Sequence, residues 1–409
     1  MDQSHVSQNI RRGTLRLLSC AFVALFASTV SAADPHQGTE NHLTQVCAEL
    51  IAAEDVQQHI ELLAGEKFLG REGKQAEAAA KYIAEFFQAQ GLKPLFGDKW
   101  FQPLPGSHLD NESVSIGQNV GGWIPGSDPE LKDEIIIVSA HYDHLGVRQG
   151  KMYPGADDNA SGVSMMLETA RQLAQARVKP RRSIAFVGFD LEERLLWGSR
   201  WFAEHPPWEL SKVKLFITAD MIGRSLGNLP LPTVFVVGSE QAPGLKKVLD
   251  SITPPAGLEV AQLGVDLIGT RSDYGPFRDH KVPFLFFSTG EHPDYHTPQD
   301  TADRIDFAKT GRVSNLVLAV TQQVANSATP PEWAPETKPD LEEAKSVHRI
   351  TTLLLEGDSS GKLKLTGVQR FFVSQVQSKT GFLVKRGSMT VEERVWLVRA
   401  AQMLLATVF

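Results

Sequence analysis

Five short apolar runs are the feature that most limits how this chain can fold. Each is rich in β-branched or aromatic residues and does not alternate with polar residues, which is typical of strands buried on both faces of a sheet. Helical stretches such as 163–176 lie between several of them. The pattern predicts an α/β fold with a mixed, largely parallel sheet flanked by helices on both faces. The predicted strands are 135–140, 183–189, 215–219, 234–237 and 283–287.

An amphipathic helix that precedes these strands in the sequence is expected to pack on the sheet. In residues 74–91, apolar side chains recur at helical spacing at Ala79, Ile83 and Phe87, and Gly91 provides a C-terminal cap. The chain has 409 residues, enough for one large α/β domain with an appendage or for two ordinary domains.

A proline-rich segment marks a boundary near the C-terminus. Residues 329–340 contain four prolines, a composition typical of a linker. Beyond it, residues 341–356 and 390–409 have the pattern of amphipathic helices. We therefore predict a main domain over residues 33–328, a linker, and a small helical C-terminal extension over residues 341–409.

The N-terminus has the features of a signal peptide. Three arginines precede an apolar run over residues 17–30, and small residues end at Ala32, after which we expect cleavage. Residues 1–32 would then direct export to the periplasm or the extracellular space. This run is too short for a stable membrane span, and no other stretch is apolar for long enough. No stable membrane span is therefore expected in the mature chain.

Cysteines and charge restrict the processing and the partners of the mature chain. Cys20 ends "LLSC", which resembles a lipidation box but falls inside the apolar run, so lipoprotein processing stays an alternative. The mature chain would keep only Cys47, which excludes an internal disulfide. Residues 1–32 carry three arginines and one aspartate, so their removal changes the formal charge from −7 to −9. This argues against nucleic acid as a partner, because phosphate binding needs a basic face.

Polar side chains that suit a metal ion follow the predicted strands. The carboxyl ends of strands are where ligands bind in open α/β sheets, and imidazole and carboxylate are ligands that zinc accepts. Converging carboxylates without a cation would destabilise the fold, so the sequence predicts a metal site. The residues are His141 and Asp143 after the first strand, Asp190, Glu192 and Glu193 after the second, Asp220 after the third, and His292, Asp294 and His296 after the last.

Five motif blocks resemble, in order and spacing, those of the di-zinc aminopeptidase family. They are "AHYDHLG", "GADDNASG", "FDLEERLLWGS", "ADMIGR" and "DYHTPQDT". This family has a zinc-dependent exopeptidase fold, and its relatives include bacterial leucyl and aminoacyl aminopeptidases, glutamate carboxypeptidases and glutaminyl cyclases. The resemblance covers residues 54–308, including "GREG" at 70–73, and does not reach the C-terminal extension.

The resemblance implies two zinc ions per chain and a specific set of ligands. Two metals close together can share a hydroxide and polarise a carbonyl group. The implied ligands are Asp157, which bridges the two ions, His141 and Asp220 on one ion, and Glu193 and His296 on the other.

Three further residues are assigned to the reaction itself. Glu192 neighbours a ligand but is not needed as one, so it would act as the general base that passes a proton from water to the leaving amine. Asp143 lies two residues beyond His141 and is placed to accept the second N–H of that imidazole, a turn residue being the alternative. Tyr295 precedes His296, and in some relatives a tyrosine there donates to the developing oxyanion, although an aromatic ring could equally pack there.

The remaining polar residues are expected to support the site. In the family the peptide bond after the bridging aspartate is often cis, and Asp158 would then bond backbone or cap the following helix. Many relatives have glycine where this chain has Leu195, so the turn there is expected to differ. Supporting positions around the metals are expected for His144, His292, Asp190 and Asp273.

The resemblance implies an exported aminopeptidase that hydrolyses the N-terminal residue of peptides with a free N-terminus. A glutaminyl cyclase or a carboxypeptidase on the same fold is an alternative, as is a receptor-like binding module without catalysis. Side-chain preference, oligomeric state and the role of the C-terminal extension are not given by these motifs.

Overall fold

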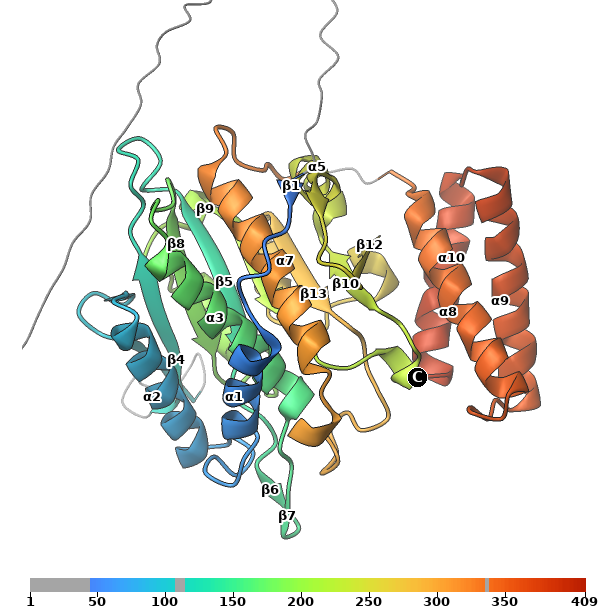
Figure 1. Ribbon diagram of the computed structural model, residues 1–409, viewed down its shortest axis with the longest axis horizontal. Helices are drawn as coiled ribbons and strands as arrows, with labels where there is room; N and C mark the ends of the chain where they lie inside the picture. Colours follow the sequence, from blue (N-terminus) through green and yellow to red (C-terminus); the bar gives the residue numbers. More distant parts are fainter. Residues whose placement is uncertain (1–44, 107–114, 335–337) are drawn as a thin grey trace, which may run out of the picture. The chain divides into compact units, whose positions relative to one another are not determined.

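The computed structural model describes residues 45–106, 115–334 and 338–409 (Figure 1). The signal peptide predicted over residues 1–32 lies outside the described residues, as does Cys20. All described residues belong to one compact unit. In these three ranges, no helix is long and apolar enough to cross a membrane.

A mixed sheet of nine strands, counted over the described residues, forms the centre of the chain. Its order is β12-β10-β13-β9-β5-β8-β4-β2, and β3 pairs with β4. The four central strands β13, β9, β5 and β8 are parallel, whereas β10 and β4 join them in antiparallel orientation. The strands are β2 (Lys93–Pro94), β3 (Phe101–Pro105), β4 (Ser115–Ile124), β5 (Ile135–His141), β8 (Ser183–Phe189), β9 (Val213–Ala219), β10 (Thr233–Val237), β12 (Glu259–Leu263) and β13 (Phe284–Ser288).

All five predicted strands are present, as β5, β8, β9, β10 and β13. Four short strands pair outside the main sheet: β1 (Gln45–Val46) with β11 (Ile252–Thr253), and β6 (Val147–Arg148) with β7 (Lys151–Met152).

Successive residues of the central strands point into two separate apolar cores. In β5, Ile136 and Val138 belong to one core, and Ile135 and Ile137 belong to the other. All four side chains are buried. Because both faces of the strand are covered, the sequence has no reason to alternate apolar with polar residues.

Helices cover both faces of the sheet, which confirms the predicted fold class. On one face α1, α3 and α7 pack against one another, and they lie in front of the sheet in Figure 1. On the other face α4 and α6 contribute Phe202 and Phe277 to the second core. The helices of this part are α1 (Ala53–Leu63), α2 (Lys74–Ala89), α3 (Gly162–Gln175), α4 (Trp197–Glu204), α5 (Pro243–Ser251), α6 (Tyr274–Asp279) and α7 (Phe307–Asn326).

The C-terminal extension consists of α8 (Leu341–Ser359), α9 (Gly367–Arg386) and α10 (Val391–Thr407). The sequence predicted α8 and α10 but not α9, whose apolar residues are spread around the helix, with Phe371 exposed and Val373 buried. Ala344 and Leu404 of the extension share an apolar core with Phe235 of β10. The extension is therefore packed onto the sheet, and the domain boundaries stay a prediction.

Candidate metal centre

The carboxyl ends of the sheet strands bring the ligand-type side chains together. His141 is the last residue of β5, Asp220 directly follows β9, and Glu193 lies in the turn after β8. Asp158 lies in an irregular helical turn, η1 (Ala156–Ser161), at the start of α3, and His296 lies in the loop after β13. Because these segments are far apart in the sequence, the site depends on the assembled sheet.

Two groups of ligand-type side chains share Asp158. Within each group, the contributing nitrogen and oxygen atoms lie within 4.8 Å of one another. Oδ1 of Asp158 is 3.2 Å from Nε2 of His141, and its Oδ2 is 3.1 Å from Nε2 of His296. A carboxylate that faces two groups in this way can bridge two cations. The first group is His141, Asp158 and Asp220, and the second is His144, Asp158, Glu193 and His296.

Glu193 links the two imidazoles of the second group. Its Oε1 is 2.8 Å from Nδ1 of His144, and its Oε2 is 3.0 Å from Nε2 of His296. His144 was expected only in a supporting position, yet the structure places it among the ligand-type atoms. The signal in the sequence is "HYDH", which puts two imidazoles three residues apart at the end of one strand.

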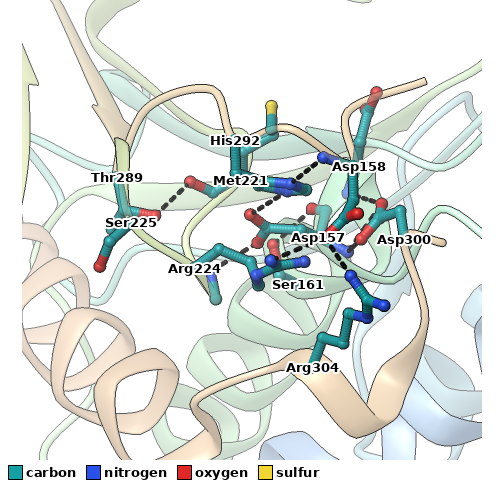
Figure 2. Close-up of polar contacts among 12 residues, drawn as sticks. Asp157, Asp158, Ser161, Met221, Arg224, Ser225, Thr289, His292, Asp300 and Arg304 are labelled. Atoms are coloured by element: carbon teal, nitrogen blue, oxygen red, sulfur yellow. Dashed lines mark hydrogen bonds and ion pairs between the residues drawn. The ribbon is translucent and has the colours of Figure 1, made fainter. Parts of the chain in front are cut away.

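Asp157, the residue expected to bridge the two ions, faces other partners (Figure 2). Its Oδ1 accepts a 2.6 Å hydrogen bond from the backbone N–H of Gly223, and its Oδ2 is 3.3 Å from Nε2 of His292. Asp157 belongs to neither ligand group. The structure therefore gives the shared position to Asp158, one residue later than expected.

The local backbone explains this difference. Asp158 and Asn159 leave the helical conformation inside η1, with φ of −105° and −134°, so the adjacent carboxylates of Asp157 and Asp158 point to different partners. The cis peptide bond expected after the bridging aspartate is found between Asp158 and Asn159. Asn159 takes the capping role expected of Asp158, because its Oδ1 accepts the N–H of Gly162 at the start of α3.

Two buried side chains that the sequence analysis did not assign hold η1 in place. The carboxylate of Asp300 accepts the backbone N–H groups of Asp157 and Asp158 at 3.0 to 3.1 Å (Figure 2). The guanidinium of Arg71 donates to five backbone carbonyls, including those of Tyr142 and Asp158. Arg71 thus ties the segment after β5 to η1. No pattern in the sequence marks an arginine whose partners are all backbone carbonyls.

Glu192 lies beside both groups but belongs to neither. It lines one cavity together with Asp158 and Asp220. Burial raises the pKa of Glu192 well above its usual range, while His141 opposes the shift and Asp220 adds to it. A carboxyl group with a raised pKa suits the task of taking up and returning a proton.

Asp143 connects His141 to the glutamate pair. Its two carboxylate oxygens accept the backbone N–H groups of Glu192 and Glu193 at 3.1 and 3.3 Å. Nδ1 of His141 is 3.3 Å from the backbone oxygen of Asp143 and 3.6 Å from its Oδ1. The atom of Asp143 within hydrogen-bond distance of His141 is thus its backbone oxygen, whereas the carboxylate, expected to accept this N–H, lies at ion-pair distance.

Tyr295 stacks on His296 and lines the same cavity as Glu192. The ring centroids of Tyr295 and His296 are 3.9 Å apart. Burial raises the pKa of the Tyr295 phenol, and the charges of Asp158 and Asp220 add to the shift. The hydroxyl group therefore stays protonated and is available as a donor.

His292, Asp190 and Asp273 surround the ligand groups without joining them. Asp190 accepts the backbone N–H of Gln118 at 3.0 Å. Burial raises the pKa of both Asp190 and Asp273 to about 7. Their supporting role stays a prediction.

Leu195 stands in a glycine-type backbone conformation, with a φ of 61°. The left-handed conformation costs a residue with a side chain roughly 1 to 2 kcal/mol. The position thus keeps the backbone that glycine would favour, and the leucine side chain is directed outward with 80% of its surface exposed.

The donor set fits zinc. Imidazole nitrogen and carboxylate oxygen are the ordinary ligands of this ion. Oδ2 of Asp158 is buried and makes no hydrogen bond. Burial alone would raise the pKa of Asp158, but the imidazoles of His144, His141 and His296 outweigh it and hold that pKa well below its usual range. Asp158 is therefore an anionic group that needs a cation.

Comparison with known proteins places these residues in a family. Residues 119–321 match peptidase family M28. The chain is 29% identical to aminopeptidase YwaD of Bacillus subtilis over 214 residues, which are 49% of this chain and 43% of that protein. A probable leucine aminopeptidase of Trichophyton verrucosum is 24% identical over 310 residues, 70% of this chain and 78% of that protein. The match to the Bacillus protein thus spans less than half of that relative.

Solved structures share the fold. The Legionella pneumophila LapA aminopeptidase aligns with a TM-score of 0.54 at 21% identity, covering 73% of this chain and 79% of that one. A glutaminyl cyclase of Porphyromonas gingivalis aligns with a TM-score of 0.52 at 19% identity, covering 68% and 99%. The match of residues 119–321 to peptidase family M28 confirms the motif resemblance.

Proposed function

We propose that this protein is a zinc metallopeptidase that removes the N-terminal residue from peptides and binds two zinc ions per chain. The observation that carries the proposal is the pair of ligand groups that share Asp158, with Glu192 unused beside them. A shared carboxylate gives a place for two ions, and a spare glutamate gives a group that can move protons.

The two ligand groups assign the residues to the ions. One ion would be held by His141, Asp158 and Asp220, and the other by Asp158, Glu193 and His296, with His144 beside Glu193. When bound, zinc polarises a carbonyl group and lowers the pKa of water.

The chain's own residues supply proton transfer and orientation. Glu192 accepts a proton from the attacking water and returns it to the leaving amine. Tyr295 donates a hydrogen bond to the negative charge that develops on the carbonyl oxygen. Asp143 holds the backbone N–H groups of Glu192 and Glu193, so that it fixes the base relative to His141.

A free α-amine on the substrate accounts for cleavage at the first peptide bond. The cavity contains the carboxylates of Asp158, Glu192 and Asp220, and a protonated amine gains a charge-assisted contact there that an acylated amine cannot make. Holding the amine at the site also fixes which carbonyl reaches the reacting groups. We further propose that the enzyme acts outside the cytoplasm, on the strength of the signal peptide predicted over residues 1–32.

The test compares a leucyl peptide with its N-acetylated twin, using purified protein supplied with zinc. We expect release of leucine from the free peptide and none from the acetylated one. Equal cleavage of both would reject the aminopeptidase assignment and leave a broader peptidase. An N-terminal glutaminyl peptide serves as the third substrate, and its cyclisation without hydrolysis of the leucyl peptide would favour a glutaminyl cyclase.

A further inference from the structure

The cavity beside the metal centre has two chemically different ends. One end is formed by Asp158, Glu192, Asp220 and Tyr295, the groups assigned to the reaction. The rest of the lining is mostly apolar, with Arg271, Ser288 and Glu291 as its other polar side chains, and the volume of the whole cavity is about 150 Å³. A substrate whose reacting carbonyl lies at the polar end therefore places an adjoining group in the apolar end.

The apolar end is built by two parts of the chain. The sheet contributes side chains such as Phe235, Val237 and Phe286. The C-terminal extension provides the opposite wall, with residues of α8 and α10 and with Phe409, which lies beyond the end of α10. Its six lining residues are Val347, Ile350, Ala401, Leu404, Leu405 and Phe409. All six lie beyond residue 321, where the family match ends.

Ion pairs of Arg394, one of them buried, fix this wall relative to the sheet. Arg394 of α10 donates to both carboxylate oxygens of Glu343 in α8, each at 2.8 Å, and to Asp266 at 2.7 and 2.8 Å. Oε1 of Glu343 also accepts the backbone N–H of Gly264. Asp266 lies in the 3-10 turn η5 (Val265–Leu267), and Leu267 of that turn lines the cavity as well.

The last helix is also seated closely at its end. The ring of Phe409 lies over Gly227, where a Cβ atom would come within 2.5 Å of the ring. Only a residue without a side chain leaves room for Phe409 at this position. The wall is therefore attached at both ends of α10, by Arg394 and by Phe409.

We propose that the C-terminal extension determines specificity, by forming the wall that binds an apolar side chain of the substrate's first residue. The inference rests on the proposed aminopeptidase function and adds the substrate class. In another protein, an apolar cavity of roughly 150 Å³ lined by leucine, isoleucine and phenylalanine binds benzene. The chain therefore selects substrates whose N-terminal residue is apolar and between leucine and phenylalanine in size. Small residues bind poorly because they leave the apolar surface unfilled, and charged residues bind poorly because they bring charge into it.

The test places a larger side chain on a residue of the extension that lines the cavity. It then measures kcat/KM on alanyl, leucyl and phenylalanyl substrates that share one chromogenic leaving group. In Leu405→Trp we expect leucyl and phenylalanyl cleavage to fall by about 10- to 200-fold, the range for changed apolar pocket contacts, while alanyl cleavage is retained. Met403→Trp is the matched control, because Met403 lies on the same helix, is 53% exposed and does not line the cavity. It should leave all three rates unchanged.

A second variant keeps the test decisive if Leu405→Trp does not fold. Phe409→Ala enlarges the cavity, so it should raise phenylalanyl cleavage relative to leucyl cleavage. Equal effects of these variants on all three substrates, or a wild-type enzyme without preference for the larger apolar residues, would overturn the role of the extension and leave the aminopeptidase function intact. A wild-type enzyme that cleaves none of the three substrates would overturn both.

Discussion

Two clusters of carboxylates, each with at least one buried member, are neutralised by different kinds of group in this protein. At the C-terminal extension, Glu343 and Asp266 face the guanidinium of Arg394, a cation supplied by the chain. At the candidate metal centre, the carboxylates of Asp158, Asp220 and Glu193 face imidazoles.

The kind of partner indicates that the cluster around Arg394 is structural and that the cluster around Asp158 is a candidate functional site. Buried charge is strongly unfavourable unless it is paired, so each cluster needs a cation. An arginine satisfies a carboxylate pair permanently and leaves no open position. A set of imidazoles and carboxylates around a shared Asp158 fits zinc, and a metal ion can also take a substrate atom as ligand. The stability of the two clusters should therefore respond differently to zinc.

The largest expected effect is loss of metal from the shared position. Asp158→Asn should abolish binding of both zinc ions, since the amide removes the anionic group common to both ligand sets. Asp157→Asn should keep both ions, because Asp157 contacts Gly223 and His292. Elemental analysis of the two purified variants beside the wild type decides it. Loss of both ions from Asp157→Asn, with retention in Asp158→Asn, would restore Asp157 as the bridge.

The adjacent glutamates should separate chemistry from metal binding. Glu192→Gln should keep zinc and lose about 10²- to 10⁴-fold in turnover, as expected for a general base. Glu193→Gln should weaken zinc binding as well, because Glu193 belongs to the second ligand group. Zinc titration and kcat measured on both variants provide the comparison. Identical behaviour of the two variants in both measurements would show that these roles are wrongly assigned.

The arginine-based cluster should contribute stability that does not depend on zinc. Arg394→Met should lower the free energy of unfolding by about 3 kcal/mol. This is the low end of the range for a broken buried ion pair, and it is chosen because Asp266 is partly exposed. The loss should be the same with and without zinc in denaturant titrations. Arg386→Met is the control, because its pair with Glu393 is more exposed and is expected to contribute little to stability. A loss seen only in the zinc-loaded protein would couple the two clusters.

Another buried carboxylate, Glu168 on α3, is paired with groups of the chain and should make a contribution to stability that depends on pH. It accepts from Arg171 at 2.7 Å and lies 3.1 Å from Nε2 of His59. Burial by itself raises the pKa of Glu168, but His59 and Arg171 outweigh it and the pKa is lowered. Its stabilising contribution is therefore present above about pH 4.3, the unperturbed value for glutamate, and is lost as the pH falls through the lower folded-state pKa.

The corresponding variant is Glu168→Gln. We expect it to be destabilised by roughly 2 kcal/mol at neutral pH, the scale of hydrogen bonds to a charged group, with the difference from wild type shrinking in acid. Unfolding midpoints measured from neutral pH to below pH 4 without zinc check this. A difference that is constant over this range would mean that Glu168 acts through packing alone.

Much of the fold could be predicted from the sequence because burial on both faces leaves a direct mark on a strand. The apolar runs of β5 and β8 coincide with the predicted segments within one residue. Helix α9 and the short strand β2 carry no such mark, since the first spreads its apolar residues around the helix and the second has only two residues. Local pattern thus predicts elements whose environment is uniform along their length.

The kinds of ligand side chain at the site could also be predicted from the sequence, but which of the two adjacent aspartates is shared could not. Histidines and carboxylates after successive strands must meet at one edge of a parallel sheet, so a metal site follows from their order. Which of the two adjacent aspartates belongs to both ligand groups depends on the backbone of η1, on Asp300 and on the carbonyl contacts of Arg71. Asp300 and Arg71 are 142 and 87 positions away from Asp158 in the sequence, so a local pattern does not reveal their contacts.

The sequence by itself therefore determined the α/β fold and the types of ligand side chain, because each depends on the kind of residue and its position relative to a strand. Only the tertiary structure decided that Asp158 is shared by both ligand groups, that His144 joins one of them, and that the C-terminal extension forms a wall of the cavity. These features depend on contacts between residues far apart in the chain, such as Arg394 with Asp266, which are separated by 128 positions.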